Sequence, residues 1–440
     1  MKTAHWLLGL LACALCSDAI PARGGSVLPG VTGFGLDTRA GQGGKVIRVT
    51  NLDAAGPGSL RAALEADGPR IVVFEVGGVI DLDRKSLSVL KPFLTLAGQT
   101  APSPGITIIR GALTITTHDV LVQHIRVRPG DAGRPKRSGW EPDGISVYGA
   151  DAYNVVIDHC SVSWAVDENL SASGARTAGP KATARRVTFS NCIIAEGLHD
   201  SSHRKGPHSK GSLIHDFCQD IAVIGNLYAH NDNRNPYFKA YCTGAIVNNV
   251  IYNPGRAAIK LSYAPREWRE AKIRPSNARA SVVGNVLLHG QNTMKGLALV
   301  EPLGDAYMKD NRALDREGKP AALTRGKITV LREKPAWPQG LRALPAAAVL
   351  EHVLTRAGAR PRDRDDVDAR IVRGVRDRKG QIIDSQEDVG GYPKVKMTRR
   401  KLDLPAGDIE AWLRRLASKL EQPAKNVRPA PTRGTPPSPL

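Results

Sequence analysis

The stretch Val155-Val-Ile-Asp-His159-Cys-Ser-Val162 decides the fold, because its frame returns along the chain, as in Ile221-Ala-Val-Ile-Gly-Asn226-Leu-Tyr228. In each copy an alternating apolar run leads, through one residue, to an Asn or a His and then to a second apolar run. Six segments follow this frame, built on His124, His159, Asn191, Asn226, Asn249 and Asn285. Their uneven spacing is typical of a coil of constant circumference that is interrupted by insertions of variable length. The repeat predicts a solenoid of strands, in which residues far apart along the chain converge in space.

The alternation in twos excludes helices for these segments, since a helix places its apolar residues at intervals of three and four. A glycine-rich cap loop is expected at 26–42 and the solenoid over roughly 44–300. Near its start, residues 59–65 have helical spacing and residues 70–76 read as a buried strand. Past residue 300 the pattern changes, and short helices are expected at 344–357, 365–375 and 408–420.

The chain therefore divides into four predicted regions. They are a signal peptide at 1–22, the solenoid domain at 23–300, a C-terminal extension with short helices at 301–421, and a disordered, proline-rich tail at 422–440.

The Asn residues of the repeat have a structural explanation. At a bend between strands, an Asn side chain can bond its own backbone and the Asn of the next coil, and it tolerates left-handed backbone geometry. We interpret four members as structural, namely Asn191, Asn226, Asn249 and Asn285.

The strongly basic composition limits the partners of this chain. Lys and Arg number 62 against 42 Asp and Glu, which gives the 440 residues a formal net charge of +20. Such a charge predicts attraction to a polyanion, whether nucleic acid, an anionic membrane or an acidic polysaccharide. Aromatic residues make up only 5% and are not interleaved with the basic ones, which argues against a nucleic-acid stacking surface.

The first residues predict export. Lys2 is followed by an apolar stretch at 6–16 and then by small and polar residues, the layout of a secretory signal. The stretch is too short to span a membrane, and no other segment would cross one. We expect a secreted protein, extracellular or periplasmic. Leu10-Leu-Ala-Cys13 also resembles a lipobox, which keeps lipid attachment at Cys13 open.

Four cysteines follow the predicted signal: Cys160, Cys192, Cys218 and Cys242. An even number in an exported chain permits disulfides. We favour a bridge between Cys218 and Cys242, and leave the other two as either a second bridge or inward-facing small hydrophobes.

An acidic cluster precedes the helix expected at 365–375, and it comprises Asp363, Asp365, Asp366 and Asp368. The glycine and glutamate of an EF-hand do not follow at the required spacing. We interpret these residues as solvated acids at a helix start.

Acidic side chains frame the segment built on His159. Glu141-Pro-Asp143-Gly precedes it, and Asp167-Glu168 follows it. Neighbouring coils would hold the two groups side by side, and hard cations such as calcium take carboxylates gathered from several backbone positions. The alternative, surface acids paired with Arg or Lys, stays open on spacing alone.

The next coils supply cations. His203-Arg-Lys-Gly-Pro-His-Ser-Lys210 places Lys210 at the entrance of a strand, and Arg234-Asn-Pro236 leaves the Asn226 segment. Pro236 fixes its own backbone angle and restrains the residue before it, so the turn would aim Arg234 in a defined direction. Together the acids and cations predict a groove that binds a metal ion and a carboxylated ligand.

These residues resemble the pectate lyases of polysaccharide lyase family 1. The likeness covers roughly residues 30–300 and is strongest in Val156-Ile-Asp-His-Cys-Ser-Val-Ser163, Asp167, His208-Ser-Lys210-Gly-Ser-Leu and Arg234-Asn-Pro236. It implies an all-β fold, a right-handed parallel β-helix with a mostly irregular or helical C-terminal extension. It also implies a monomer that cleaves polygalacturonate, an acidic polysaccharide, by β-elimination with calcium (Ca2+) as cofactor.

The resemblance implies roles for single residues. Asp143 would be the principal calcium ligand, with Glu141 a second and more variable one, and Asp167 the ligand from the next coil. Lys210 would grip the substrate carboxylate, and Arg234 would remove the proton from carbon 5 of the sugar.

Two departures from the family pattern matter for the site. Ser171 stands where the family usually has an acid, so Glu168 or a substrate oxygen would complete the calcium site. Lys239 fills the last position of the Arg-x-Pro-x-x-Arg motif, which keeps a cation but loses the bidentate fork of arginine. We assign Lys239, His208 and Arg204 to substrate binding.

Rival functions stay open on the residues alone. A β-helical glycoside hydrolase of uronic-acid polymers could use Asp143 and Asp167 as its pair of carboxylates. A non-catalytic β-helix that binds acidic polysaccharides would tolerate the missing acid at Ser171. Only elimination creates a conjugated double bond, so product absorbance separates these functions.

Overall fold

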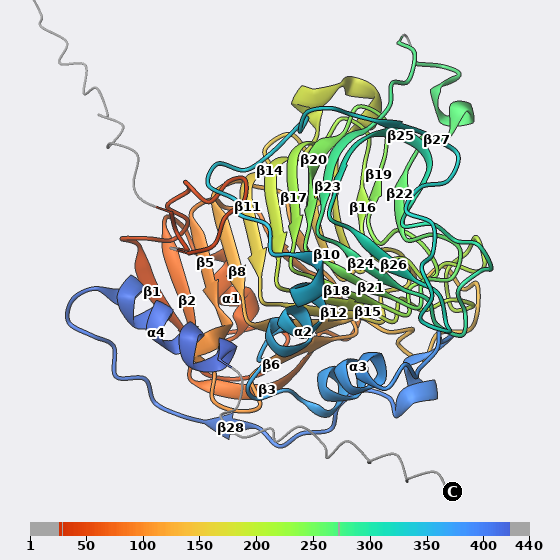
Figure 1. Ribbon diagram of the computed structural model, residues 1–440. Helices are drawn as coiled ribbons and strands as arrows, with labels where there is room; N and C mark the ends of the chain where they lie inside the picture. Colours follow the sequence, from red (N-terminus) through yellow and green to blue (C-terminus); the bar gives the residue numbers. More distant parts are fainter. Residues whose placement is uncertain (1–25, 29, 272, 423–440) are drawn as a thin grey trace, which may run out of the picture.

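The computed structural model describes residues 26–28, 30–271 and 273–422. Within them the chain winds into a right-handed parallel β-helix whose coils each cross three sheets, and C-terminal helices lie against its outside (Figure 1). The predicted signal peptide, Cys13 and the tail from residue 423 on lie outside the described residues. The predicted fold class is confirmed.

We name the three sheets in the order in which a coil meets them. The first sheet contains β4 (Leu87–Val89), β7 (Leu113–Ile115), β10 (Ile145–Tyr148), β13 (Leu170–Ser173), β16 (Leu213–Ile214), β19 (Tyr237–Phe238), β22 (Ile259–Leu261) and the first part of β25 (Val300–Lys309).

The second sheet contains β1 (Lys45–Val49), β2 (Arg70–Phe74), β5 (Leu94–Ala97), β8 (Val120–Gln123), β11 (Tyr153–Asp158), β14 (Arg185–Ser190), β17 (Gln219–Ile224), β20 (Thr243–Val247), β23 (Arg279–Val283), the second part of β25, and β27 (Lys327–Val330). The third sheet contains β3 (Val76–Asp81), β6 (Ile106–Ile109), β9 (Ile125–Arg128), β12 (Ser161–Ser163), β15 (Ile193–Ala195), β18 (Leu227–Ala229), β21 (Val250–Tyr252), β24 (Val286–Leu288) and β26 (Arg312–Leu314), with β28 (Thr398–Arg399) antiparallel to β3.

The core follows from the alternation of side chains along each strand. In β11, Val155 and Ile157 point into the solenoid, whereas Val156 points outward and packs against the N-terminal cap loop. The parallel register places Val155 beside Val187 and Ile157 beside Phe189 of the next coil. Equivalent positions therefore stack along the whole solenoid, which favours β-branched and aromatic residues there.

The bend between the second and third sheets takes two residues. The first has left-handed backbone geometry, as at His124 (φ 58°), His159 (φ 47°) and Asn191 (φ 52°). The second points inward, and there Asn226 donates to Asn249, which donates to Asn285. A buried ladder of amides results.

This geometry corrects the predicted frame. Its first three members, His124, His159 and Asn191, lie one residue before the inward position that Asn226 occupies. Ser161 pairs with Ile193 and Ile193 with Leu227, so Cys160 and Cys192 share the inward position with Asn226. His159 and Asn191 instead occupy the first bend position, because Asn and other polar residues suit both places.

The four cysteines are free thiols, which corrects the predicted bridge between Cys218 and Cys242. All four are buried and belong to the apolar core. Side chains on neighbouring parallel coils point the same way into that core, and a disulfide needs them to converge. The predicted alternative for Cys160 and Cys192, inward-facing small hydrophobes, therefore describes all four.

Parallel pairing continues past residue 300 through β25, β26 and β27. Apolar faces of α2 (Ala346–Arg356) and α3 (Asp366–Arg376) then cover the outside of the third sheet, and α4 (Ile409–Glu421) covers the first coils of the second sheet (Figure 1). The short elements are α1 (Leu60–Glu65), η1 (Gly98–Thr100), η2 (Arg176–Ala178), η3 (Pro180–Ala182), η4 (Pro265–Trp268) and η5 (Gln386–Val389). None of the described helices is long and apolar enough to cross a membrane.

The acidic cluster before α3 corrects another interpretation, because two of its members are not solvated. Asp365 caps α3 and accepts a hydrogen bond of 2.6 Å from Arg128, and Asp368, which is fully buried, accepts one of 2.8 Å. Arg126 also pairs with both carboxylates. The helix covers two outward-facing arginines of β9, and buried charges of this kind persist only when paired.

Candidate active site

The residues whose side chains could take part in a reaction lie at the edge of the first sheet, where loops enter its strands. Asp143 precedes β10, Glu168 precedes β13, Lys210 precedes β16 and Arg234 precedes β19. Parallel bridges join Glu168 to Lys210 and Lys210 to Asn233, so the sheet's register extends into these loops. Side chains from four consecutive coils are therefore held side by side.

Gly211 allows the coils of Lys210 and Arg234 to approach closely. A Cβ atom at this position would lie 2.4 Å from the carbonyl oxygen of Arg234. The same carbonyl accepts a hydrogen bond from the backbone N–H of Ser212. The Lys-Gly-Ser sequence thus fixes the lysine beside the arginine.

Three carboxylates cluster within this edge: Asp143, Asp167 and Glu168, whose oxygens lie within 4.8 Å of one another. Asp143 accepts hydrogen bonds from the backbone N–H of Glu168 (3.0 Å) and from the hydroxyl of Ser171 (3.1 Å). Burial and the negative charge of Asp167 raise the pKa of Asp143 to about 7. Such crowding of carboxylates favours either a proton or a cation between them.

A hard divalent cation fits this cluster. Calcium takes oxygen ligands from several backbone positions, and three carboxylates with a neighbouring hydroxyl, that of Ser171, provide such a set. Ser171 cannot replace the charge of an acid, but its hydroxyl holds Asp143 in place. Glu168 supplies the third carboxylate.

Two histidines orient Asp167. His208 Nε2 lies 3.1 Å from Asp167 Oδ1 and His203 Nε2 lies 3.8 Å from Oδ2, and the two rings stack at 3.5 Å. Although burial opposes it, the contacts with these two histidines hold the pKa of Asp167 well below its usual range. His208 therefore lies against the carboxylate cluster. Sequence reasoning missed the role of His203, which stands one turn earlier in the same loop.

Glu141 and Arg204 lie beside the three-carboxylate cluster. Glu141 accepts a hydrogen bond of 2.6 Å from the backbone N–H of Arg204, and its Oε1 lies 3.6 Å from His203 Nδ1. Glu141 thus holds the loop that carries the histidines. The side chain of Arg204 is exposed and crosses over Gly139.

Lys210 is a buried cation with one ion-pair partner among the described residues. Its Nζ lies 4.0 Å from Asp232 Oδ2, and Asp232 is already paired with Arg256 at 2.5 Å. Burial lowers the pKa of Lys210 to about 8. The ammonium is therefore poised to bind another anion.

Arg234 faces the carboxylates. Its backbone is left-handed (φ 65°), a strained geometry for a non-glycine residue, and its guanidinium forms an ion pair with Glu168. The guanidinium also lies 5.9 Å from the centre of the Tyr237 ring. Burial lowers the pKa of Arg234, although Asp167 opposes the shift.

Lys239 forms ion pairs outside the three-carboxylate cluster. Its ammonium pairs with Asp216 at 3.3 Å and with Glu267, and only 6% of the side chain is exposed. Another cation near Arg234 is Lys260 of the next coil, whose Nζ lies 4.7 Å from the centre of the Tyr237 ring. The repeat could have pointed to Lys260, because this residue occupies the same position in its coil as Tyr237 does in the coil before.

Comparisons with known proteins complete this description. No protein-family model matches the chain. The chain is 32% identical over 394 residues to "Probable pectate lyase C" of Neosartorya fischeri, which covers 87% of this chain and 84% of the relative. The protein of the same name from Aspergillus flavus is 32% identical over 375 residues, 82% and 80% of the two chains. The crystal structure of the major allergen from cedar pollen has a TM-score of 0.53 at 16% identity, covers 73% of this chain and 90% of its own, and supports the fold.

Stacked coils with acids and cations at one sheet edge, together with these relatives, define a polysaccharide lyase. The chain belongs to the pectate lyase family. The predicted family and enzyme class are confirmed, which disfavours the glycoside hydrolase and the non-catalytic binder.

Proposed function

We propose that this protein cleaves polygalacturonate by calcium-assisted β-elimination, with Arg234 as the base. The observation that carries the proposal is the position of Lys210 and Arg234 on consecutive coils, next to the three carboxylates. Relatives named pectate lyase support the choice of substrate. The basic charge of the chain suits a polyanion of this kind.

Asp143, Asp167 and Glu168 would hold the calcium ion. When bound, the ion supplies positive charge that stabilises the second negative charge which develops on the uronate carboxylate. Burial, and after it the negative charge of Asp167, raises the pKa of Asp143, and a bound cation would offset both costs. Ion binding and the chemistry of the substrate thus need the same cluster.

Lys210 and Arg234 divide the remaining work. The ammonium of Lys210 binds the substrate carboxylate and stabilises the enolate-like intermediate. Arg234 takes the proton from carbon 5, the electron pair forms the double bond to carbon 4, and the glycosidic oxygen leaves with the bonding electrons and takes a proton from water. A guanidinium is normally protonated, and the burial that lowers the pKa of Arg234 favours its neutral form.

We further infer that the protein is exported and acts as a monomer. The sequence of residues 1–22 supports export, and the Cys13 motif supports a lipid anchor as a variant of it. Arg204 and Lys260 lie beside the site and would contact further substrate carboxylates, in place of Lys239.

Absorbance of the unsaturated product tests the reaction. Purified protein with polygalacturonate should show rising ultraviolet absorbance, which a chelator abolishes and added calcium restores. Asp167→Ala should raise the calcium requirement. New reducing ends without absorbance would indicate hydrolysis, and full activity in chelator would contradict the role of calcium.

A further inference from the structure

A second cluster of metal-ligating side chains lies away from the first sheet. His124 and His159 occupy the bends between the second and third sheets on neighbouring coils, and Glu421 ends α4, which passes over these bends. Their donor atoms lie within 4.8 Å of one another. The proposed elimination chemistry uses none of these residues.

The distances match a small tetrahedral ion. Glu421 Oε1 lies 3.4 Å from His124 Nε2 and 3.7 Å from His159 Nδ1. Ligands held at about 2.0–2.1 Å by tetrahedral zinc stand roughly 3.4 Å apart. Both distances from Glu421 therefore need little change to hold such an ion.

His124 provides an independent observation. Its side chain is fully buried, and Nδ1 lies 2.8 Å from the carbonyl oxygen of Ala359. A carbonyl only accepts, so Nδ1 carries a proton, and in the neutral ring Nε2 presents its lone pair. Nε2 has no hydrogen-bond partner among the described residues and is directed at Glu421. A second-shell carbonyl that fixes the tautomer in this way is typical of histidine ligands.

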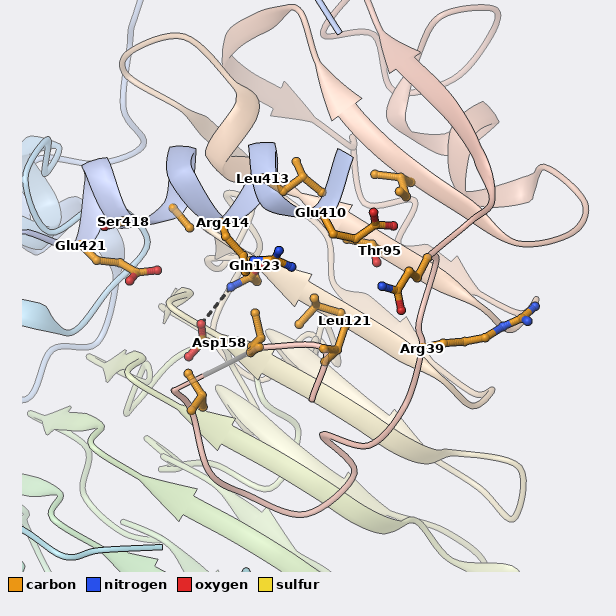
Figure 2. A pocket seen from close by; sticks show the side chains of 16 residues that line it. Arg39, Thr95, Leu121, Gln123, Asp158, Glu410, Leu413, Arg414, Ser418 and Glu421 are labelled. Carbon is orange, nitrogen blue, oxygen red and sulfur yellow. Dashed lines mark hydrogen bonds between the residues drawn. The ribbon is translucent and has the colours of Figure 1, made fainter. Parts of the chain in front are cut away.

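Asp158 offers a fourth donor and a link to solvent. Its Oδ2 lies 2.9 Å from His159 Nδ1, and Gln123, Ser190 and Asn191 donate to the carboxylate. Asp158 and Glu421 both line a cavity of about 330 Å³ beneath α4 (Figure 2). The cavity therefore reaches two of the four donors, Asp158 and Glu421.

We propose that His124, His159 and Glu421, with Asp158 as the fourth donor, form a site for a divalent transition-metal ion of the zinc type. Two imidazoles and carboxylates suit zinc better than calcium, which prefers oxygen alone. The ion clamps the C-terminal helix to two coils of the β-helix. Binding replaces the proton between His159 and Asp158.

Zinc binding to the full-length protein tests this site. Metal is first stripped with a chelator, and zinc alone is then titrated by calorimetry. His208→Gln serves as the background, because the active-site pair of His203 and His208 could also take zinc. In that background Glu421→Gln should weaken zinc binding at least about tenfold, as even the loss of a second-shell partner can do. Glu410→Gln, on the same helix and lining the same cavity, should leave it unchanged.

Thermal unfolding separates a metal clamp from an ordinary ion pair. Zinc should raise the melting temperature of the Glu410→Gln variant and not that of Glu421→Gln, while both keep the elimination activity of the His208→Gln background. Equal zinc binding by the two variants, or no binding at micromolar zinc, would overturn the proposal and leave Glu421 as a contact of His124 that binds no metal. Glu421 is substituted here in preference to the buried His124, because a His124→Gln variant could fail to fold. Glu421 lies at a helix end, so its variant tests the site in the folded protein.

Discussion

The ladder of amides and the edge of the first sheet bury polar groups in opposite ways. In the ladder, Asn249 donates to Asn285 and accepts from Asn226, and Asn226 and Asn249 are fully buried. At the edge, Asp143 and Lys210 carry charges with incomplete partners, and their pKa values move to about 7 and about 8. Amides that hydrogen-bond to one another stabilise the coil, whereas buried charged groups with incomplete partners are typical of a ligand-binding site.

The largest effect is expected at Arg234. If this residue is the base, Arg234→Ala should lower kcat on polygalacturonate by about 10²–10⁴, the usual contribution of a general base. Arg234→Lys, which keeps a cation, should lose nearly as much because an ammonium replaces the guanidinium at carbon 5. Product absorbance measures both, and circular dichroism shows whether the coil stays folded.

Arg279→Ala is the matched control, since Arg279 is an exposed cation at the start of β23. Its activity should stay near that of the unsubstituted protein. Near-normal elimination by Arg234→Ala would show that another group removes the proton.

A substitution in the amide ladder should lower the stability of the protein and leave its elimination activity unchanged. Asn249→Ala leaves the backbone N–H of Asn226 and the carbonyl of Val223 without their partners. Buried groups left unpaired cost about 1–3 kcal/mol each, so the free energy of unfolding should fall by roughly 2–6 kcal/mol. Denaturant unfolding measures this fall, with Asn277→Ala, a partly exposed residue, as the control. A loss of kcat in the folded variant would contradict the division between ladder and edge.

The same contrast explains what the sequence could predict. Alternation and repeats identified the solenoid, because the side-chain period of a strand is visible without coordinates. The order of Asp143, Asp167, Lys210 and Arg234 predicted a site, since consecutive coils must stack. The one-residue shift at His159 was not predictable, because both bend positions accept polar residues.

Pairings with distant partners were also beyond the sequence. Nothing local shows that Glu267 binds Lys239, or that Arg128 of β9 takes up Asp365 and Asp368 of the C-terminal extension. Such contacts depend on how loops and helices fold over the coil, and the repeat carries no information about that.

The calcium requirement should depend on pH. Asp143 must be deprotonated to bind the cation, and its pKa is about 7, so the half-saturating calcium concentration should rise about tenfold per unit as pH falls below 7. Without calcium, the raised pKa means that Asp143 costs stability as pH rises from about 4 through 7. Calcium should therefore raise the melting temperature more at pH 8 than at pH 5.5.

Calcium titrations at pH 6, 7 and 8 measure this dependence, and Asp143→Asn should remove it. On the alkaline side, Lys210 loses its proton as pH rises through about 8, so KM should rise there. A half-saturating calcium concentration that is the same at pH 6 and pH 8 would show that Asp143 is not a ligand.

Ser171 gives the smallest expected effect and the finest test of the edge. Ser171→Asp adds a fourth carboxylate next to Asp143, whose Oδ2 lies 3.1 Å from the hydroxyl. Above pH 8 the added ligand should lower the half-saturating calcium concentration about threefold, or roughly 0.6 kcal/mol. Below pH 7 the new charge repels Asp143 and favours its protonated form, so the gain should vanish. Ser173→Asp, two residues along β13 on the same face, should change neither value, because the proposed cation site lies at the strand entrance. An equal gain there would mean that added charge, and not a ligand, is responsible.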